Sequence, residues 1–468
     1  MKLTEIDITN FRCFEDLVVP LRPDVNVFVG VNASGKTAIL DAIAIALYDI
    51  VAANGGGGKR QRALQGVNIR PSDIHIPLAP IRPETGPREY VQISAQVGSY
   101  YALRDFPSQT LLGEQTFIDW TNTIRYRPPN DFTYGTSQSP HLSDLYRYFQ
   151  ALWQEISRSD PKALIPLPVV AYYRVHRCLF QMPQMGDIFQ AKLERKDAFQ
   201  HALNAGANYQ AMCQWFYLRE NRELRERLQI RDDRAFEFPD LRAVRRALSE
   251  TLEHVERIFF DDSPPRLKVA FATPYVSHQV LELEQLSDGY RNLLAVVLDF
   301  ARRLAQANPH WDNPLEAPGI LLIDEIELHL HPGWQQSIIP NLRKVFPNTQ
   351  LILATHSPQV LTTVRKEHVR CLTAQHTLEP LPADIGTYGS ESSFALEMVF
   401  GVHTRPKTTV ETVGKLEEYL RLVEARQYAS EEAKQLRTEL EADLGTSDPS
   451  LTMADVRIRQ LEILAKKR

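Results

Sequence analysis

The sequence has few cysteines and no long hydrophobic run. Its four cysteines are scattered singly without CxxC spacing, at Cys13, Cys178, Cys213 and Cys371. This pattern excludes a zinc ribbon and a secreted disulfide framework. The amino terminus, MKLTEIDITNFRCF, lacks the apolar core of a signal peptide, and no run of 18 apolar residues occurs elsewhere. We therefore predict a cytoplasmic protein with no membrane segment.

Neither sign of charge dominates. The chain has 53 basic and 58 acidic side chains and a formal net charge of −5. This balance excludes a uniformly basic nucleic-acid binder but allows a local basic surface. The densest charged segment, Arg219–Arg246, mixes arginines with acidic residues, which predicts a solvated helical face and not a nucleic-acid track.

Hydrophobic patterning predicts an α/β protein. Short strands are expected near Leu3–Ile8 and Leu17–Leu21, and the apolar run Val25–Val29 precedes a helix over Ala38–Ile50. Strands and helices alternate again after Arg266, which implies a mostly parallel sheet. The 468 residues allow two or three domains.

Four parts are expected along the chain. Apolar residues from Leu241 to Phe259 recur at steps of three and four, the period of an amphipathic helix. The glycine stretch Asn54–Arg62 is either a flexible insertion or a basic loop that contacts phosphate, and the sequence leaves both open. The predicted parts are residues 1–188, an amino-terminal lobe with a loop-rich sheet; 189–265, a helical insertion; 266–407, a carboxy-terminal lobe; and 408–468, a helical tail.

The tail is expected to hold short amphipathic helices. Ser430 is a plausible helix cap, and Gly445 should end that helix. The apolar faces must be buried, either on their own subunit or by a docking partner, and both remain open. These faces carry Leu416, Leu420, Val423, Leu436, Leu440, Leu461 and Leu464.

The strongest motif is the phosphate-binding pattern GVNASGKT at Gly30–Thr37, between an apolar strand and a helix. In this arrangement backbone N–H groups point at phosphate oxygens, Lys36 supplies a cation, and the Thr37 hydroxyl is a ligand for Mg²⁺. We therefore predict that the chain binds ATP and Mg²⁺. The predicted nucleotide contacts are Gly30, Asn32, Ala33, Ser34, Gly35, Lys36, Thr37 and Ala38.

Two further apolar runs end in side chains suited to hydrolysis. The run Ile320–Ile323 ends at Asp324, a second expected ligand for Mg²⁺, and at Glu325, placed to activate water. The run Leu351–Ala354 leads to His356, which could bond the terminal phosphate. Glu325 and His356 are the predicted catalytic residues.

These motifs, together with Leu286–Arg291, resemble the ABC-type ATPases of the SMC, RecF and OLD-like branch. The resemblance covers residues 1–60 and about 280–360. It implies an ABC-type ATPase head with a mixed sheet around a RecA-like phosphate-loop core. The segment NFRCF, typical of the beginning of this branch, adds Arg12 to the nucleotide contacts.

In this family a signature segment closes over nucleotide bound to the opposite subunit, so the resemblance implies a head-to-tail homodimer. Its signature residues here are Ser287, Asp288 and Gly289, although Asp288 and Tyr290 depart from the fullest LSGGQ form. His331 belongs to the expected D-loop. Metal binding by His329 and His331 is disfavoured because the short loop that contains them offers no third ligand.

More weakly, the spacing of the motifs and the short tail resemble the PtuA group of Septu and retron-associated antiphage systems. Members of that group form homo-oligomers and act with a separately encoded HNH nuclease. The resemblance implies such a nuclease partner, and contacts with nucleic acid or a retron reverse transcriptase–DNA complex.

Three other functional classes fit the sequence less well. A self-sufficient OLD-type nuclease would need a DxD pair after His356, and none follows. A transporter subunit usually has a much shorter spacing between its phosphate loop and its signature. A DNA-repair ATPase of RecF or SMC type remains the main alternative, although the helical insertion is too short for SMC arms.

Overall fold

The computed structural model describes residues 1–56, 70–75, 90–98, 117–127, 131–133, 142–158, 165–175, 193–204, 206, 208–230, 235–262, 265–272, 279–406 and 410–466. It divides into two compact units, Met1–Ala395 and Leu396–Arg468. Most of the glycine stretch, from Gly57 to Arg62, lies outside the described residues. Its two interpretations therefore both remain predictions.

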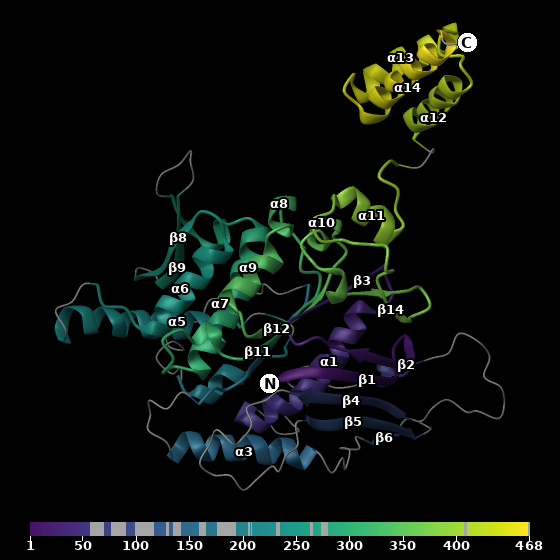
Figure 1. Cartoon of the computed structure of the whole chain (residues 1–468). Helices are drawn as coiled ribbons and strands as arrows, with labels where there is room; N and C mark the ends of the chain where they lie inside the picture. Colours follow the sequence, from purple (N-terminus) through teal and green to yellow (C-terminus); the bar gives the residue numbers. More distant parts are fainter. Residues whose placement is uncertain are drawn as a thin grey trace. The chain divides into compact units, whose positions relative to one another are not determined.

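The first unit contains a six-stranded sheet in the order β14-β13-β3-β12-β11-β7 (Figure 1). Its strands run parallel except for β14, so the carboxyl ends of the parallel strands share one edge. The predicted α/β class with a mixed sheet around a phosphate loop is confirmed. The strands are β3 Val25–Gly30, β7 Val169–Tyr173, β11 Gly319–Ile323, β12 Thr349–Ala354, β13 Val369–Leu372 and β14 Leu378–Pro380.

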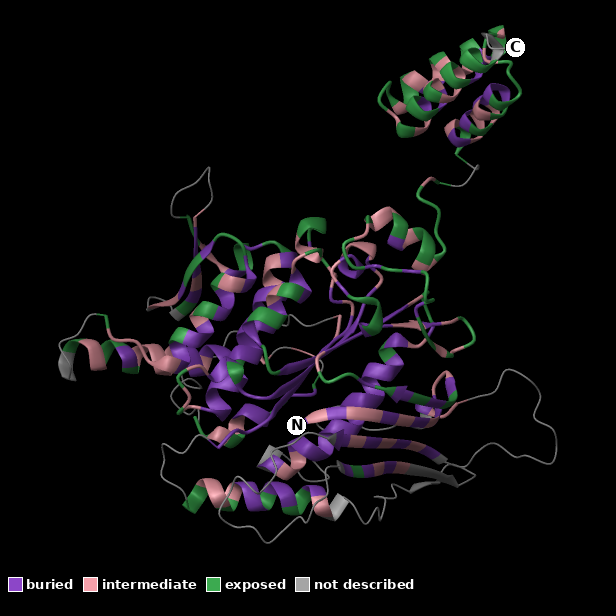
Figure 2. Cartoon of the chain, viewed as in Figure 1, coloured by how far each residue is buried: buried purple, intermediate pink, exposed green. Residues whose placement is uncertain are grey.

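A second sheet, antiparallel and ordered β2-β1-β4-β5-β6, covers the other side of helix α1 (Lys36–Val51). The Trp120 indole donates to the Ala46 carbonyl at 3.1 Å, and the Asn122 amide donates to the Asp49 carboxylate at 3.0 Å. The helix is buried along nearly its whole length (Figure 2). The strands are β1 Lys2–Phe11, β2 Phe14–Pro20, β4 Tyr90–Gly98, β5 Phe117–Arg127 and β6 Asp131–Thr133.

One helical stretch among the described residues, Lys36–Asn54, is long and apolar enough to span a membrane by length and composition. It contains α1, and 83% of its most apolar 18-residue stretch is buried inside the protein. A buried core helix meets the same criterion, so this apolar composition is accounted for by the packing of α1 between two sheets.

The expected helical insertion contains α5 (Tyr209–Arg225) and α6 (Pro239–Thr251). The prediction that this helix continues to Phe259 is wrong. Helix α6 ends at Thr251, and Val255–Asp262 forms strand β8. The chain reverses at His254, which has a left-handed φ of 67°. The β-branched and aromatic residues that follow suit a strand, and they pair with β9 (Pro265–Phe271), next to β10 (Gln279–Glu282).

The remaining helices of the first unit flank these sheets. These helices are α3 Leu142–Arg158, α7 Asp288–Ala307, α8 Pro332–Gln335, α9 Ile338–Val345 and α10 Pro358–Leu361. Two of them, α8 and α9, are separated by a break between Gln335 and Ile338. Helix α11, Ser392–Phe400, lies at the boundary of the two units in the sequence.

The second unit packs α12 (Glu411–Glu424), α13 (Glu431–Leu444) and α14 (Pro449–Lys466) around a core of their own. The Ser430 hydroxyl accepts from the Ala433 amide at 3.1 Å, and Gly445 ends α13, so both predicted helix limits are confirmed. Most of the apolar residues expected on helix faces therefore bury one another. Leu464 is an exception, with 54% exposure.

Candidate nucleotide site

The phosphate loop, Gly30–Thr37, joins β3 to α1, and close neighbours require its glycines. A Cβ at Gly35 would lie 2.5 Å from the Phe14 ring, and the backbone there has a φ of 109°. A Cβ at Gly30 would lie 2.4 Å from the Leu372 carbonyl oxygen. The glycine spacing of the motif thus follows from the packing of the β1–β2 turn and β13 against the loop.

Lys36 is buried beneath this loop. Its ammonium donates to the carbonyls of Gly30 at 2.9 Å and Val31 at 3.0 Å. Burial lowers the pKa of Lys36 to about 8, against the opposing attraction of Asp324 and nearby glutamates. A desolvated cation in this position gains from an anion placed on the loop.

Thr37 and Asp324 meet although they lie far apart in the sequence. The Thr37 hydroxyl donates to the Asp324 carboxylate at 2.8 Å. Both are hard oxygen ligands of the kind that Mg²⁺ prefers. The Ser34 hydroxyl oxygen is buried without a hydrogen-bond partner, as expected for a group that a phosphate oxygen would satisfy. The loop residues therefore fit a nucleoside triphosphate with Mg²⁺.

The other loop residues differ in exposure. Asn32 and Ala33 are exposed at its tip, where Ala33 has a left-handed φ of 64°, and Ala38 is buried in the first turn of α1.

The end of β11 places Asp324 and Glu325 at the same sheet edge as this loop. The Asp324 amide donates to the Tyr173 carbonyl at 2.9 Å, and Glu325 follows with a left-handed φ of 46°. For a residue other than glycine this conformation is costly, and it turns the chain sharply at the strand end. Strand order therefore brings three of the predicted residues, Thr37, Asp324 and Glu325, to one edge.

His356 follows β12, the strand between β11 and β3. Burial, followed by the charge of Lys36, lowers the pKa of His356, so the ring is neutral at pH 7. Its backbone amide donates to Glu327 at 2.6 Å, and the Thr355 hydroxyl donates to the other oxygen of Glu327 at 2.6 Å. Sequence reasoning assigned no role to Glu327, which fixes the position of the histidine.

The signature segment begins α7. Ser287 is exposed at the N-cap, yet its side chain accepts no hydrogen bond from the helix, and Asp288 pairs with Arg291. A Cβ at Gly289 would lie 2.4 Å from the carbonyl oxygen of His329. The glycine of the signature is therefore required by the close approach of the D-loop.

His331 is exposed in that D-loop and caps α8, where its Nδ1 accepts from the Gly333 amide at 3.2 Å. Among the described residues, no group of three or more histidines, cysteines or acids could hold a metal ion.

Comparison with known proteins identifies the family. A family model described as "AAA domain" matches residues 5–256, and one described as "AAA domain, putative AbiEii toxin, Type IV TA system" matches residues 200–362. The chain belongs to the AAA-domain ATPase family.

Several relatives of this ATPase carry retron or Septu names. It is 43% identical to "Retron Ec83 probable ATPase" of Escherichia coli over 180 residues, which is 38% of this chain and 32% of the relative. It is 25% identical to "Retron Vc95 probable ATPase" of Vibrio cholerae serotype O1 biovar El Tor over 66% of this chain and 69% of the relative. It is 43% identical to "Septu protein PtuA" of Bacillus mycoides (strain KBAB4) over 16% of this chain and 10% of the relative.

The match to the Ec83 protein thus spans about a third of that relative's length. Among solved structures, an Smc head bound to the C-terminal winged-helix domain of ScpA matches with a TM-score of 0.45 and 14% identity, covering 81% of this chain and 97% of that chain.

In this ATPase, Arg12 does not contact the phosphate loop through any described hydrogen bond. Its guanidinium donates to Asp41 of α1 at 2.5 Å and to Asp73 at 2.8 Å. Asp41 also accepts from the Tyr172 hydroxyl at 2.7 Å and from Arg174 at 2.9 Å. Burial favours the neutral acid, but Arg174 and then Arg12 outweigh it and lower the pKa of Asp41. Arg12 thus anchors the helix that carries the phosphate loop.

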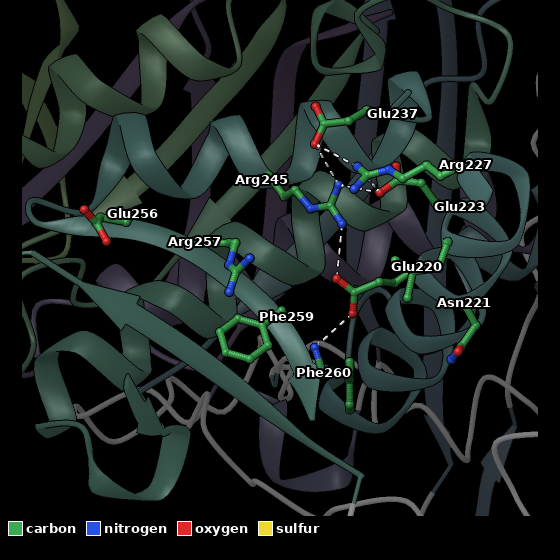
Figure 3. Close-up of a pocket in the computed structure, with 11 residues that line it drawn as sticks. Glu220, Asn221, Glu223, Arg227, Glu237, Arg245, Glu256, Arg257, Phe259 and Phe260 are labelled. Carbon is green, nitrogen blue, oxygen red and sulfur yellow. Dashed lines mark hydrogen bonds and ion pairs between the residues drawn. The ribbon is translucent and has the colours of Figure 1, made fainter. Parts of the chain in front are cut away.

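The charged segment expected to be a solvated face is instead partly buried. Glu223 is 1% exposed and bonds both Arg227 and Arg245 at 2.9 Å, and Arg245 also reaches Glu220 at 3.1 Å (Figure 3). These side chains line a cavity of about 490 Å³ between α5, α6 and β8. The acids and arginines are dense because they pair with one another within the protein.

Replacing Glu327 with alanine should separate binding from turnover. The Glu327→Ala variant loses the acceptor of both the Thr355 hydroxyl and the His356 amide. We expect ATP affinity to stay within about two-fold and turnover to fall on the order of 10²-fold, because His356 is no longer held in place. Isothermal titration and a phosphate-release assay measure the two quantities. Thr355→Val completes a double-mutant cycle; additive effects on turnover would show that the pair does not act together.

Proposed function

We propose that the chain binds ATP with Mg²⁺ and hydrolyses it. The observation that carries this proposal is the convergence of the Thr37–Asp324 pair, the buried ammonium of Lys36 and the strand-end Glu325 at one sheet edge. Lys36 and the loop amides hold phosphate oxygens, and Thr37 with Asp324 would hold the metal. The bound Mg²⁺ would neutralise charge on the transferred phosphate.

In this proposal Glu325 orients and deprotonates the attacking water, while His356, held by Glu327, bonds the terminal phosphate. The neutral state of His356 suits that task, because the ring can donate from one nitrogen without bringing a second proton to the site.

The active form is a head-to-tail homodimer. Each chain has one phosphate loop and one predicted signature, and the exposed Ser287 side chain makes no capping bond to its own helix. When the N-cap side chain makes no capping bond, the first backbone N–H groups of a helix can donate to an external anion. Because Gly289 packs against the D-loop, signature and D-loop present one surface to a second copy.

We further infer a role in antiphage defence, in which the ATPase regulates a separately encoded HNH nuclease in the cytoplasm. The relatives named as retron ATPases match over 38% and 66% of this chain, whereas a RecF protein matches over 9% and a Rad50 ATPase over 10%, which supports this class over a repair ATPase. Nucleic acid or a retron reverse transcriptase–DNA complex would be a further partner. The second unit offers a docking face: α14 carries a stripe of exposed apolar residues opposite its buried side, formed by Met453, Val456, Ile463 and Leu464.

Binding and hydrolysis should be separable. Lys36→Ala removes the cation beneath the loop and should abolish ATP binding, whereas Glu325→Gln should bind ATP and lower turnover by about 10²–10⁴-fold, because the amide cannot take a proton from water. Isothermal titration and phosphate release measure both. Wild-type turnover by Glu325→Gln would refute the assignment of the base.

Turnover should require two chains. A heterodimer of Lys36→Ala and Ser287→Arg chains keeps one intact composite site, whereas each variant alone has none. We expect ATP hydrolysis only after mixing, measured on heterodimers purified through two different tags. Verified heterodimers without any activity would argue that the site is not shared.

The apolar stripe of α14 should be needed for the nuclease. Two lysines, in a Met453→Lys/Ile463→Lys variant, place charge on this exposed face without entering the core of the second unit. We expect unchanged ATP hydrolysis and loss of the co-expressed HNH protein in a pull-down. Glu432→Lys, at an exposed position of α13, is the matched control. Full retention of the nuclease by the double variant would exclude this face.

A further inference from the structure

Strand order indicates where the nucleoside end of ATP lies. Strand β3, which leads into the phosphate loop, lies between β12 and β13. Asp324, Glu325 and His356 all follow strands on the β12 side of β3. On the proposed function, on which this inference rests, the terminal phosphate faces that side. The nucleoside must therefore extend over the other flank, toward β13 and β14.

The turn between β13 and β14 reaches back to the phosphate loop on this flank. His376 has a left-handed φ of 61°, and its Nδ1 lies 3.1 Å from the carbonyl oxygen of Ser34. Because a carbonyl only accepts, Nδ1 carries the proton and donates. The ring also meets Phe14 edge to face, with centroids 6.1 Å apart. Phe14 in turn packs beneath Gly35.

Closure of the hairpin does not require this histidine. The turn is closed by the Thr373 amide, which donates to the Thr377 carbonyl at 3.0 Å, and by a contact of 2.7 Å between the two threonine hydroxyls. A left-handed position is met at lower cost by glycine or asparagine. What the histidine adds is a half-buried aromatic ring, fixed by Ser34 and Phe14 beside the loop.

We propose that His376 is a nucleobase-binding residue, whose ring stacks on the purine of the bound nucleoside triphosphate. Aromatic and histidine side chains bind bases through their faces, and stacking is tolerant of base identity. The carbonyl of Ser34 and the ring of Phe14 hold His376 in place for this contact.

The test compares ATP with inorganic tripolyphosphate, which has no base. His376→Asn suits the left-handed backbone and keeps an N–H donor but removes the ring. We expect this variant to bind ATP on the order of ten-fold more weakly. Its affinity for tripolyphosphate, obtained from competition with labelled ATP, should equal that of the wild type. Gln375→Ala, exposed in the same turn, is the control and should change neither.

His376→Trp supplies a direct readout. We expect its added fluorescence to be quenched by ATP and not by tripolyphosphate. Equal ATP binding by wild type and His376→Asn, or equal weakening of both ligands, would overturn the proposal; the second result would mean that His376 only supports the loop. Absence of quenching despite ATP binding would also overturn it. If wild-type protein binds no ATP, the proposed function itself fails.

Discussion

The arrangement of the site depends on two buried carboxylates on opposite sides of β7. Asp299 of α7 is 1% exposed, pairs with Arg302 at 2.6 Å and Arg303 at 2.9 Å, and accepts from the Tyr173 hydroxyl at 2.9 Å. Burial opposes ionisation, but Arg303 and Arg302 outweigh it and lower the pKa of Asp299. On the other side, Tyr172 and Arg174 bond Asp41 of α1. Because a buried carboxylate that loses a hydrogen-bond donor costs about 1–3 kcal/mol, the Tyr173 and Tyr172 hydroxyls join β7 to α7 on one side and to α1 on the other.

The start of α7 is joined to the end of β11 by a second set of contacts. Gly289 lies against the His329 carbonyl, and the next residue, Tyr290, meets Trp334 edge to face with centroids 4.3 Å apart. The Tyr290 ring also meets Phe271 of β9 at 5.3 Å. The D-loop that contains His329 follows β11 directly. Because packed aromatic side chains leave little free volume, these contacts hold the start of α7 against the segment that follows β11.

The phosphate loop, its flanking strand and helix, and the limits of α13 could be predicted because each depends on local sequence. Lys36 lies between an apolar strand and a helix, and Ser430 and Gly445 bound α13 by their own chemistry. The buried charges could not be predicted. Asp299, Arg302 and Arg303 have the spacing of a solvated helix face, and only the packing of β7 against α7 shows that they are buried. Glu327 was missed for the same reason: its partner, Thr355, lies on the neighbouring strand end.

Several departures from local preference lie at the candidate site. Among the described residues, nine other than glycine have a left-handed φ, and four of them are Ala33 of the phosphate loop, Glu325 after β11, His329 and His376 beside Ser34. The other five are Asn10, Arg12, His201, His254 and Arg426. Each costs on the order of 1–3 kcal/mol and persists only where the surrounding packing holds it. Ser287 adds an N-cap hydroxyl that makes no capping bond, which forgoes about 1 kcal/mol. Stability alone would remove such features. At Ala33, Glu325 and His376, which lie in or beside the phosphate loop and at the end of β11, such features are expected where a binding surface, and not the fold, sets the local conformation.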